Sequence, residues 1–219
     1  MSEVQIEQAI AAFVTFFVVI NAVGVAPVFA ALTEGDGPAF ARKMAVRSTI
    51  VATLVIFLFA FAGPWLLENL GISLDAFRIA GGALLFLIAL EMVFEKRQER
   101  QKNRADAVLA EGEASGGLDD ISVFPIGIPM IAGPGAIATA MLYMRNAGGD
   151  PVNILIVVAA IGANLLLVLV TFLIAGPLMR LMGESIAGAI TRIFGVILAA
   201  LAIQFMVDGL KAVFLTPAA

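Results

Sequence analysis

The chain contains no histidine and no cysteine among its 219 residues. Their absence excludes thiol chemistry, histidine-based metal sites, Ser–His and Cys–His nucleophile pairs, and a proton relay built on histidine. The motifs G-x-S-x-G and H-E-x-x-H are also missing, as is a pair of aspartates in the middle of an apolar segment. We therefore expect no enzyme activity, no metal site and no cofactor, and no nucleic-acid partner.

Charge is scarce as well. Only 14% of the residues are charged, against ~25% in soluble domains, while 61% are apolar and the mean hydropathy is +1.04. Six apolar segments each reach the ~20 residues that a bilayer helix needs, and none alternates with the period of a barrel strand. The sequence predicts an all-α polytopic protein of the lipid bilayer, with six transmembrane helices near residues 6–32, 44–67, 76–95, 122–145, 152–175 and 187–212.

The few basic residues predict how the chain is oriented. Most lysines and arginines lie between spans one and two, three and four, and five and six. The positive-inside rule places these three intervals in the cytoplasm and both termini on the extracytoplasmic side of the cell inner (plasma) membrane. The N-terminus is acidic, with Glu3 and Glu7, and has no basic segment, so the first span is interpreted as part of the mature protein and not as a cleaved signal.

A polar segment over residues 96–120 divides the chain. It carries both charges and contains Ser115-Gly116-Gly117 near its end, which is typical of a flexible cytoplasmic linker. Its basic first half could also lie against anionic lipid. The predicted organisation is a three-helix repeat over residues 1–95, the linker, and a second three-helix repeat over residues 121–219.

The two halves resemble each other at a constant offset. Ala62-Gly63-Pro64 recurs as Ala175-Gly176-Pro177, and the same offset relates three further pairs: Gly82 and Gly195, Ala89 and Ala202, Glu91 and Gln204. Because three spans is an odd number, the second half must enter the membrane from the opposite side. The fold predicted is therefore two inverted three-helix repeats, an architecture that places substrates near the midplane between broken helices.

Helices one and four are the ones predicted to be broken at mid-membrane. The first contains N-A-V-G-V-A-P over residues 21–27, and the fourth contains A-G-P-G-A over residues 132–136. Gly and Pro free backbone groups there, and each freed group costs several kcal/mol in hydrocarbon unless something supplies a partner. We expect a ligand or ion path at these breaks; the alternative is that Gly and Pro only permit close helix crossing or a kink.

The chemistry of the two breaks suits a zwitterion. A helix that restarts after Pro134 leaves the amides of Gly135, Ala136 and Ile137 free, and a helix N-terminus attracts a carboxylate. Carbonyl groups at the end of the first half-helix, around Val19 to Asn21, could accept an ammonium group or a cation. Asn164 either lines the path or bonds two helices together. The predicted substrate-binding residues are Asn21, Gly24, Pro27, Gly133, Pro134, Gly135, Ala136 and Asn164.

Glu91 and its mirror residue Gln204 are the candidates for ion coupling. A glutamate within a span is a functional candidate by default, and an interfacial anchor is the alternative, because Glu95 and Lys96 follow closely. The sequence leaves proton coupling, sodium coupling and simple facilitation open. It is also compatible with a homo-oligomer.

Three motifs resemble the MarC family of six-span inner-membrane proteins, which includes small neutral amino acid transporters. They are N-A-V-G-V-A-P-V-F (residues 21–29), G-I-S-L-D-A-F-R-I-A-G-G-A-L-L-F (71–86) and P-M-I-A-G-P-G-A-I (129–137). Ala22 stands where the family usually has proline. The resemblance implies transport of small neutral amino acids such as alanine and glycine, with export as a physiological direction.

A lipid-linked phosphate flippase, a membrane scaffold and a channel are the alternatives to this function. A flippase for a lipid-linked phosphate could also use helix N-termini, but it calls for Arg or Lys at the breaks, and none lies within the spans near Asn21 or Gly133. A membrane scaffold leaves two broken helices unexplained. Channel-like permeation of small polar solutes is not separable from carrier behaviour by sequence.

Overall fold

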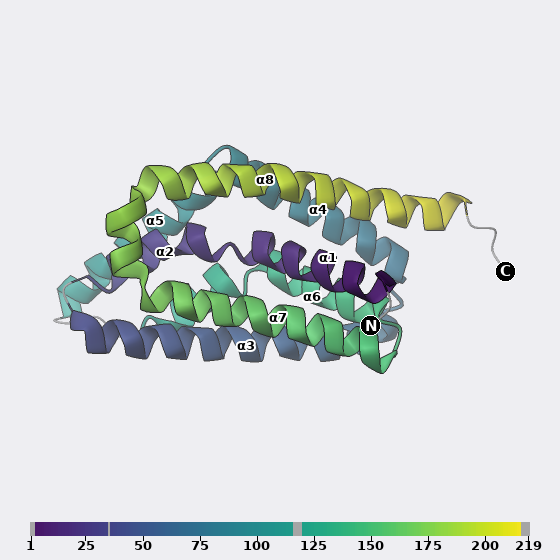
Figure 1. The fold of residues 1–219 in the computed structure, drawn as a ribbon, viewed down its shortest axis with the longest axis horizontal. Helices are drawn as coiled ribbons and strands as arrows, with labels where there is room; N and C mark the ends of the chain where they lie inside the picture. Colours follow the sequence, from purple (N-terminus) through teal and green to yellow (C-terminus); the bar gives the residue numbers. More distant parts are fainter. Residues whose placement is uncertain (1–2, 35, 116–119, 216–219) are drawn as a thin grey trace.

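The computed structural model describes residues 3–34, 36–115 and 120–215, and every regular element in these ranges is a helix. Figure 1 shows their arrangement. The elements are α1 (Glu3–Ile20), α2 (Ala22–Leu32), α3 (Gly37–Asn69), α4 (Leu74–Val93), α5 (Lys96–Ser115), η1 (Ser122–Ile131), α6 (Pro134–Asn146), α7 (Pro151–Leu173) and α8 (Ala175–Leu215).

The lengths of the helices agree with the predicted membrane spans. Within the described residues, five stretches are long and apolar enough to cross a bilayer, and η1 with α6 makes a sixth if this bent pair counts as one span. The axes of η1 and α6 differ by 57°. The prediction of an all-α polytopic membrane protein is confirmed at this level, with five or six spans.

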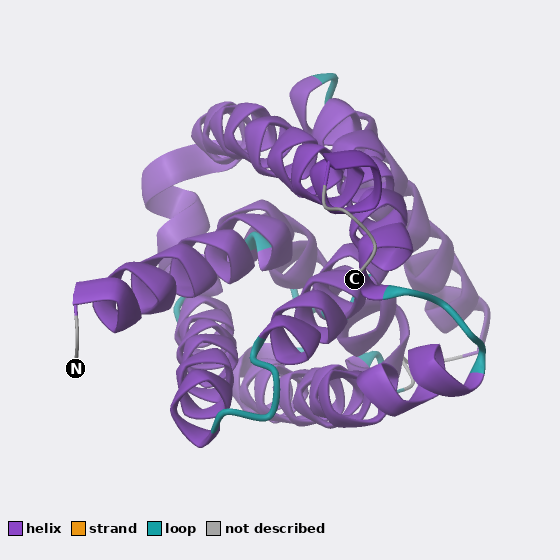
Figure 2. Ribbon diagram, turned by 90° about the vertical axis from the view of Figure 1, so that its right-hand side faces the viewer, coloured by secondary structure: helices purple, strands orange, loops and turns teal. Residues whose placement is uncertain are grey.

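Most helices run side by side along the long axis of the molecule (Figures 1 and 2). α5 and the start of α8 lie at one end, and the N-terminus of α1 lies at the other. α8 changes direction at Gly183, whose φ of 68° is a left-handed conformation that glycine adopts without a steric penalty. The candidate site lies where α5 meets the bundle.

The most extensive helix pair is α4 with α8, and two glycines make the close approach feasible. A Cβ atom on Gly82 would lie 2.7 Å from the carbonyl oxygen of Ala202, and one on Gly195 would lie 3.0 Å from that of Ala89. The two contacts are reciprocal, because Gly195 and Ala202 are the offset partners of Gly82 and Ala89. Small residues of this kind let membrane helices pack backbone to backbone.

Other helix pairs match in the same way. α1 packs on α7 and η1 packs on α3, while α2 packs on α8 and α6 packs on α4; α3 and α7 pack on each other. The core between them is apolar and includes the stacked rings of Phe29 and Phe172, whose centroids are 4.2 Å apart. α1 and η1 thus have corresponding neighbours, which are α7 and α3. The same is true of α2 and α6, which pack on α8 and α4.

The segment predicted to be a flexible linker is largely a helix that packs on the bundle. Residues 96–120 were expected to form a flexible tether, but α5 (Lys96–Ser115) is a helix that docks on the bundle. Lys, Arg, Gln, Glu and Ala, which dominate this segment, are strong helix formers. Gln101 and Ala105, one turn apart, are buried on the docked face. The Gly-Gly end of the predicted linker, residues 116–117, lies outside the described residues.

Candidate functional site

The first interruption is a single residue, Asn21, between α1 and α2. Its backbone is left-handed (φ 53°, ψ 58°), a conformation that asparagine tolerates better than most residues. Its side-chain oxygen accepts from the Gly24 amide at 3.2 Å, which caps α2, and its nitrogen donates to the Thr191 hydroxyl of α8 at 3.3 Å. Both ends of the Asn21 amide are therefore used inside the protein, where the residue is buried.

Gly24 is required by this cap. A Cβ atom at residue 24 would lie 2.7 Å from the Thr191 hydroxyl and would also collide with the Asn21 amide. Asn21 and Gly24, which were predicted to bind substrate, thus have a structural role in the fold, because they fix how α2 continues after α1.

The second interruption is longer than the sequence indicated. η1 is irregular from its start, with extended backbone at Phe124 and Ile128, each directly before a proline. A proline has no N–H to donate and disfavours helix at the preceding residue, so Pro125 and Pro129 prevent a regular helix here. Regular α-helix begins only at Pro134, after the extended residue Gly133.

The start of α6 leaves free amides. Gly133 offers no side-chain cap, Pro134 occupies the first turn, and the first bond of the helix joins the Ile137 amide to the Gly133 carbonyl at 3.1 Å. Within the described part of the chain, the amides of Gly135 and Ala136 have no acceptor. Of the three amides predicted to be free, those of Gly135 and Ala136 are free, whereas the prediction was wrong for Ile137, whose amide bonds to the Gly133 carbonyl.

The two interruptions lie close together. A Cβ atom on Gly135 would lie 3.4 Å from Val19 Cγ1, at the end of α1, and 2.8 Å from Ile88 Cδ1 on α4. The start of α6 therefore packs against the last turn of α1 and against α4. Any side chain at residue 135 would require the end of the Ile88 side chain to move.

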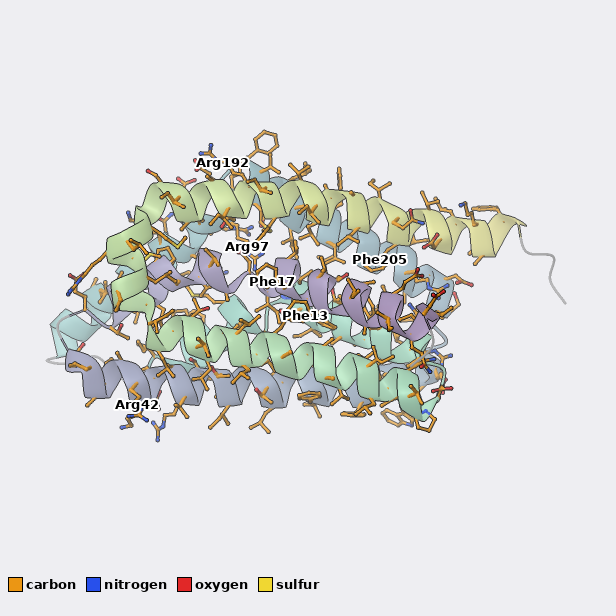
Figure 3. The ribbon with its side chains drawn as sticks, in the orientation of Figure 1. Phe13, Phe17, Arg42, Arg97, Arg192 and Phe205 are labelled. Carbon is orange, nitrogen blue, oxygen red and sulfur yellow. The ribbon has the colours of Figure 1, made fainter. Side chains whose placement is uncertain are left out.

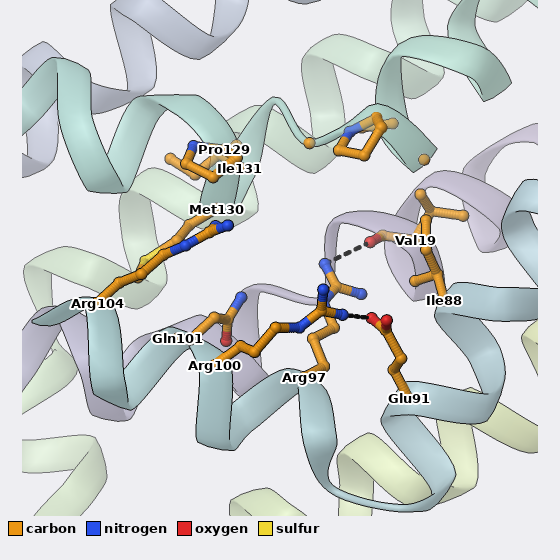
Figure 4. A pocket seen from close by; sticks show the side chains of 14 residues that line it. Val19, Ile88, Glu91, Arg97, Arg100, Gln101, Arg104, Pro129, Met130 and Ile131 are labelled. Atoms are coloured by element: carbon orange, nitrogen blue, oxygen red, sulfur yellow. Dashed lines mark hydrogen bonds and ion pairs between the residues drawn. The ribbon is translucent and has the colours of Figure 1, made fainter.

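A cavity of about 160 Å³ opens at this point, and we call it the α6 pocket (Figure 4). Its wall includes residues 133–136 and the adjoining end of η1, together with Val19, Ile88 and Glu91. The remaining lining side chains come from α5, which closes one side: Arg97, Arg100, Gln101 and Arg104.

Arg97 reaches the interior of the bundle, whereas Arg42 and Arg192 lie on its outside (Figure 3). Its guanidinium donates to the Val19 carbonyl at 3.3 Å and contacts the Met92 sulfur at 3.2 Å. Burial lowers the pKa of Arg97 to about 10, against the opposing effect of Glu91, so it remains cationic at neutral pH. The Val19 carbonyl, predicted to be available to an ammonium group, is thus occupied by Arg97.

Two further α5 side chains give the pocket its polar character. Arg100 forms an ion pair with Glu91 across the pocket, as Figure 4 shows. Gln101 is only 7% exposed, and none of the described residues forms a hydrogen bond with its amide. The amide lines the α6 pocket, so its donor and acceptor groups are available there to a ligand or to water.

Gly24 and Pro27 line a different cavity. This α2 pocket, of about 540 Å³, lies between α2 and α5 and also has Glu95, Glu99 and Asp106 in its wall. Gly24 and Pro27, from the first break, therefore face a pocket separate from the one at residues 133–136. α5 forms a wall of both pockets, and Asn21 lines neither of them.

The other predicted residues lie apart from both pockets. Asn164 on α7 donates to the carbonyl of Phe13 on α1 at 3.1 Å and to that of Ala160 at 2.9 Å, so it joins two helices. Gln204 is exposed and donates to Asp208 at 2.7 Å. Of the two coupling candidates, only Glu91 lines the α6 pocket.

The contribution of α5 to the pocket was not predicted from the sequence. A phosphate ligand was disfavoured because the spans carry no Arg or Lys near the breaks, but Arg97, Arg100 and Arg104 reach the second break from the linker. The available signal was their spacing of three to four residues, which places side chains on one side of a helix.

The fold is that of a polytopic membrane protein with five or six candidate spans in its described residues, and a basic pocket lies beside the bent pair of η1 and α6. A model of the MarC family integral membrane proteins matches residues 6–214, so the chain belongs to the MarC family. The resemblance noted in the sequence is thereby confirmed.

Curated relatives are similar over nearly their whole length. A UPF0056 membrane protein of Archaeoglobus fulgidus is 36% identical over 91% of each chain. Another from Methanocaldococcus jannaschii is 37% identical over 94% of this chain and 97% of its own. The UPF0056 membrane protein YhcE of Escherichia coli is 32% identical over 92% of this chain and 91% of its own. No solved structure gives a significant match.

Proposed function

We propose that this protein is a transporter, a secondary carrier or facilitator, for small neutral amino acids such as alanine and glycine, and that it can export them. In this proposal it has no enzymatic activity and lies in the cell inner membrane with both termini outside. The observation that carries the proposal is the pair of free amides at Gly135 and Ala136, which open into a cavity beside the end of α1.

The size of the α6 pocket favours a small solute. Its volume of about 160 Å³ is below the ~300–1,000 Å³ of pockets that hold drug-sized ligands. The pocket also offers both signs of charge, since Glu91 and Arg100 face each other there. A zwitterion of a few non-hydrogen atoms matches this volume and this charge pattern.

The inverted repeat is part of the proposal and is supported by the packing. The reciprocal contacts of Gly82 with Ala202 and of Gly195 with Ala89 are what a pseudo-two-fold axis between α4 and α8 would produce. The corresponding neighbours of α1 and η1, and of α2 and α6, point the same way. Under this symmetry the two halves could rock against each other around the pocket and open it to each side in turn.

A flippase for a lipid-linked phosphate is the second candidate. It is favoured by one observation, the approach of Arg97, Arg100 and Arg104 to the second break, because arginine binds phosphate well. The small pocket volume and the presence of Glu91 favour the amino acid, so the flippase stays the alternative.

The test is a panel of amino acids offered to purified protein in liposomes, with and without proton and sodium gradients. We expect uptake and counterflow of alanine and glycine well above protein-free liposomes, and little of lysine or tryptophan. A change of rate with one gradient would identify the coupling ion. Preference for lysine or tryptophan over alanine would contradict the proposed function.

A further inference from the structure

The docking of α5 gives the α6 pocket a second set of groups that the membrane spans do not supply. Arg100 and Gln101 line the pocket from one side, and the amides of Gly135 and Ala136 open into it from the start of α6. Figure 4 shows the Gln101 amide between Arg100 and Met130. All four groups can donate hydrogen bonds, so they suit the oxygens of an acid group.

Gln101 is the observation that points to a ligand. It is buried, its amide has no hydrogen-bond partner among the described residues, and it lines the cavity into which the α6 amides open. A side chain that served only to pack α5 against the bundle would not need a polar end here. An incoming carboxylate would accept from Gln101 and from the α6 amides together, and so would satisfy three donors that the protein leaves free.

The Glu91–Arg100 ion pair is well placed to open for such a ligand. The Arg100 side chain is 56% exposed and that of Glu91 is 31% exposed, and half-exposed pairs hold their partners only weakly. An amino acid carries the same two charges. Its carboxylate can take the place of Glu91 beside Arg100, and its ammonium group can take the place of Arg100 beside Glu91.

We propose that the α6 pocket is a carboxylate-binding subsite in which Gln101, Arg100 and the amides of Gly135 and Ala136 hold the acid group of the substrate while Glu91 takes its ammonium group. This inference rests on the proposed function and adds a role for α5, which becomes part of the binding site. It selects molecules that carry a carboxylate next to an amine and have a small side chain.

Gln101→Glu is the sharpest test. The substitution keeps the size of the side chain but adds a negative charge that repels a carboxylate and can pair with Arg100 and Arg104, so the fold should be retained. In binding measurements on the purified full-length protein, we expect the affinity for alanine to fall at least tenfold, while the melting temperature stays the same or rises. Gln98→Glu is the matched control, because Gln98 lies on α5 but faces the α2 pocket; it should leave the affinity unchanged.

Three ligands accompany the variants. Alaninamide keeps the ammonium group and the size of alanine but lacks the carboxylate, so it should not compete with alanine for the wild-type protein. Inorganic phosphate and dodecyl phosphate should compete weakly. Equal competition by alanine and alaninamide, or unchanged alanine binding by Gln101→Glu, would overturn the subsite and leave the transport function standing. Tight binding of either phosphate in place of alanine would overturn both and favour the flippase.

Discussion

Gly135→Leu should abolish transport while the protein still inserts into the membrane. A Cβ atom at residue 135 would lie 2.8 Å from Ile88 Cδ1 and 3.4 Å from Val19 Cγ1 and Leu85 Cδ2. A leucine side chain must go beyond that point, so it has to fill the α6 pocket or push α6 away from α1. Either outcome removes the space for the substrate, and uptake of alanine into liposomes should fall to the level of protein-free vesicles.

The matched control is Gly162→Leu on α7. A Cβ atom at residue 162 meets nothing within 4 Å, so a leucine there can extend into open space, which is lipid if α7 spans the bilayer. We expect normal uptake from this variant. Normal uptake by Gly135→Leu would mean that the substrate does not pass through the α6 pocket.

Gly82→Leu should have the largest effect on stability. A Cβ atom at residue 82 would lie 2.7 Å from the Ala202 carbonyl oxygen and 3.1 Å from the Met206 amide nitrogen. Both are backbone atoms that cannot rotate away, so α4 and α8 must separate along their most extensive contact. Overpacking usually costs ~1–3 kcal/mol and sometimes more, and we expect a fall of on the order of 10 °C in melting temperature.

Gly81→Leu is the control for this effect. Gly81 is the neighbouring residue on the same helix, and a Cβ atom there meets nothing within 4 Å. Both variants replace a helical glycine by leucine and so lose the same backbone flexibility. The difference between their melting temperatures therefore measures the effect on the α4–α8 contact. If Gly81→Leu and Gly82→Leu melted at the same temperature in detergent, close packing at residue 82 could not be what holds this pair together.

Hydropathy alone predicted much of the fold. The intervals 44–67, 76–95 and 152–175 fall on α3, α4 and α7 within a few residues at most ends, because long apolar segments have one low-energy state in a bilayer. Asn21 and residues 133–136 were located for a similar reason: Gly, Pro and Asn disturb a helix locally, whatever surrounds them. In the fourth span the effect of Pro125 and Pro129 was underestimated.

The site was harder to predict because it depends on which surfaces meet. Arg97 and Gln101 lie in a polar segment that reads as solvent-exposed linker, and nothing local says that one face of it is buried. Asn21 was expected to face a substrate, but Thr191, 170 residues away, takes its amide. Such pairings follow from tertiary packing and are not encoded in short motifs.

The most direct test of the central claim, that a small amino acid binds at the start of α6, uses the absence of native cysteine. In an Ala136→Cys variant, a small methanethiosulfonate reagent should modify the thiol, and alanine should slow this modification several-fold. In a Val28→Cys variant, whose thiol faces the α2 pocket, alanine should have no effect. Equal rates with and without alanine in the Ala136→Cys variant, or equal protection in both variants, would contradict the account.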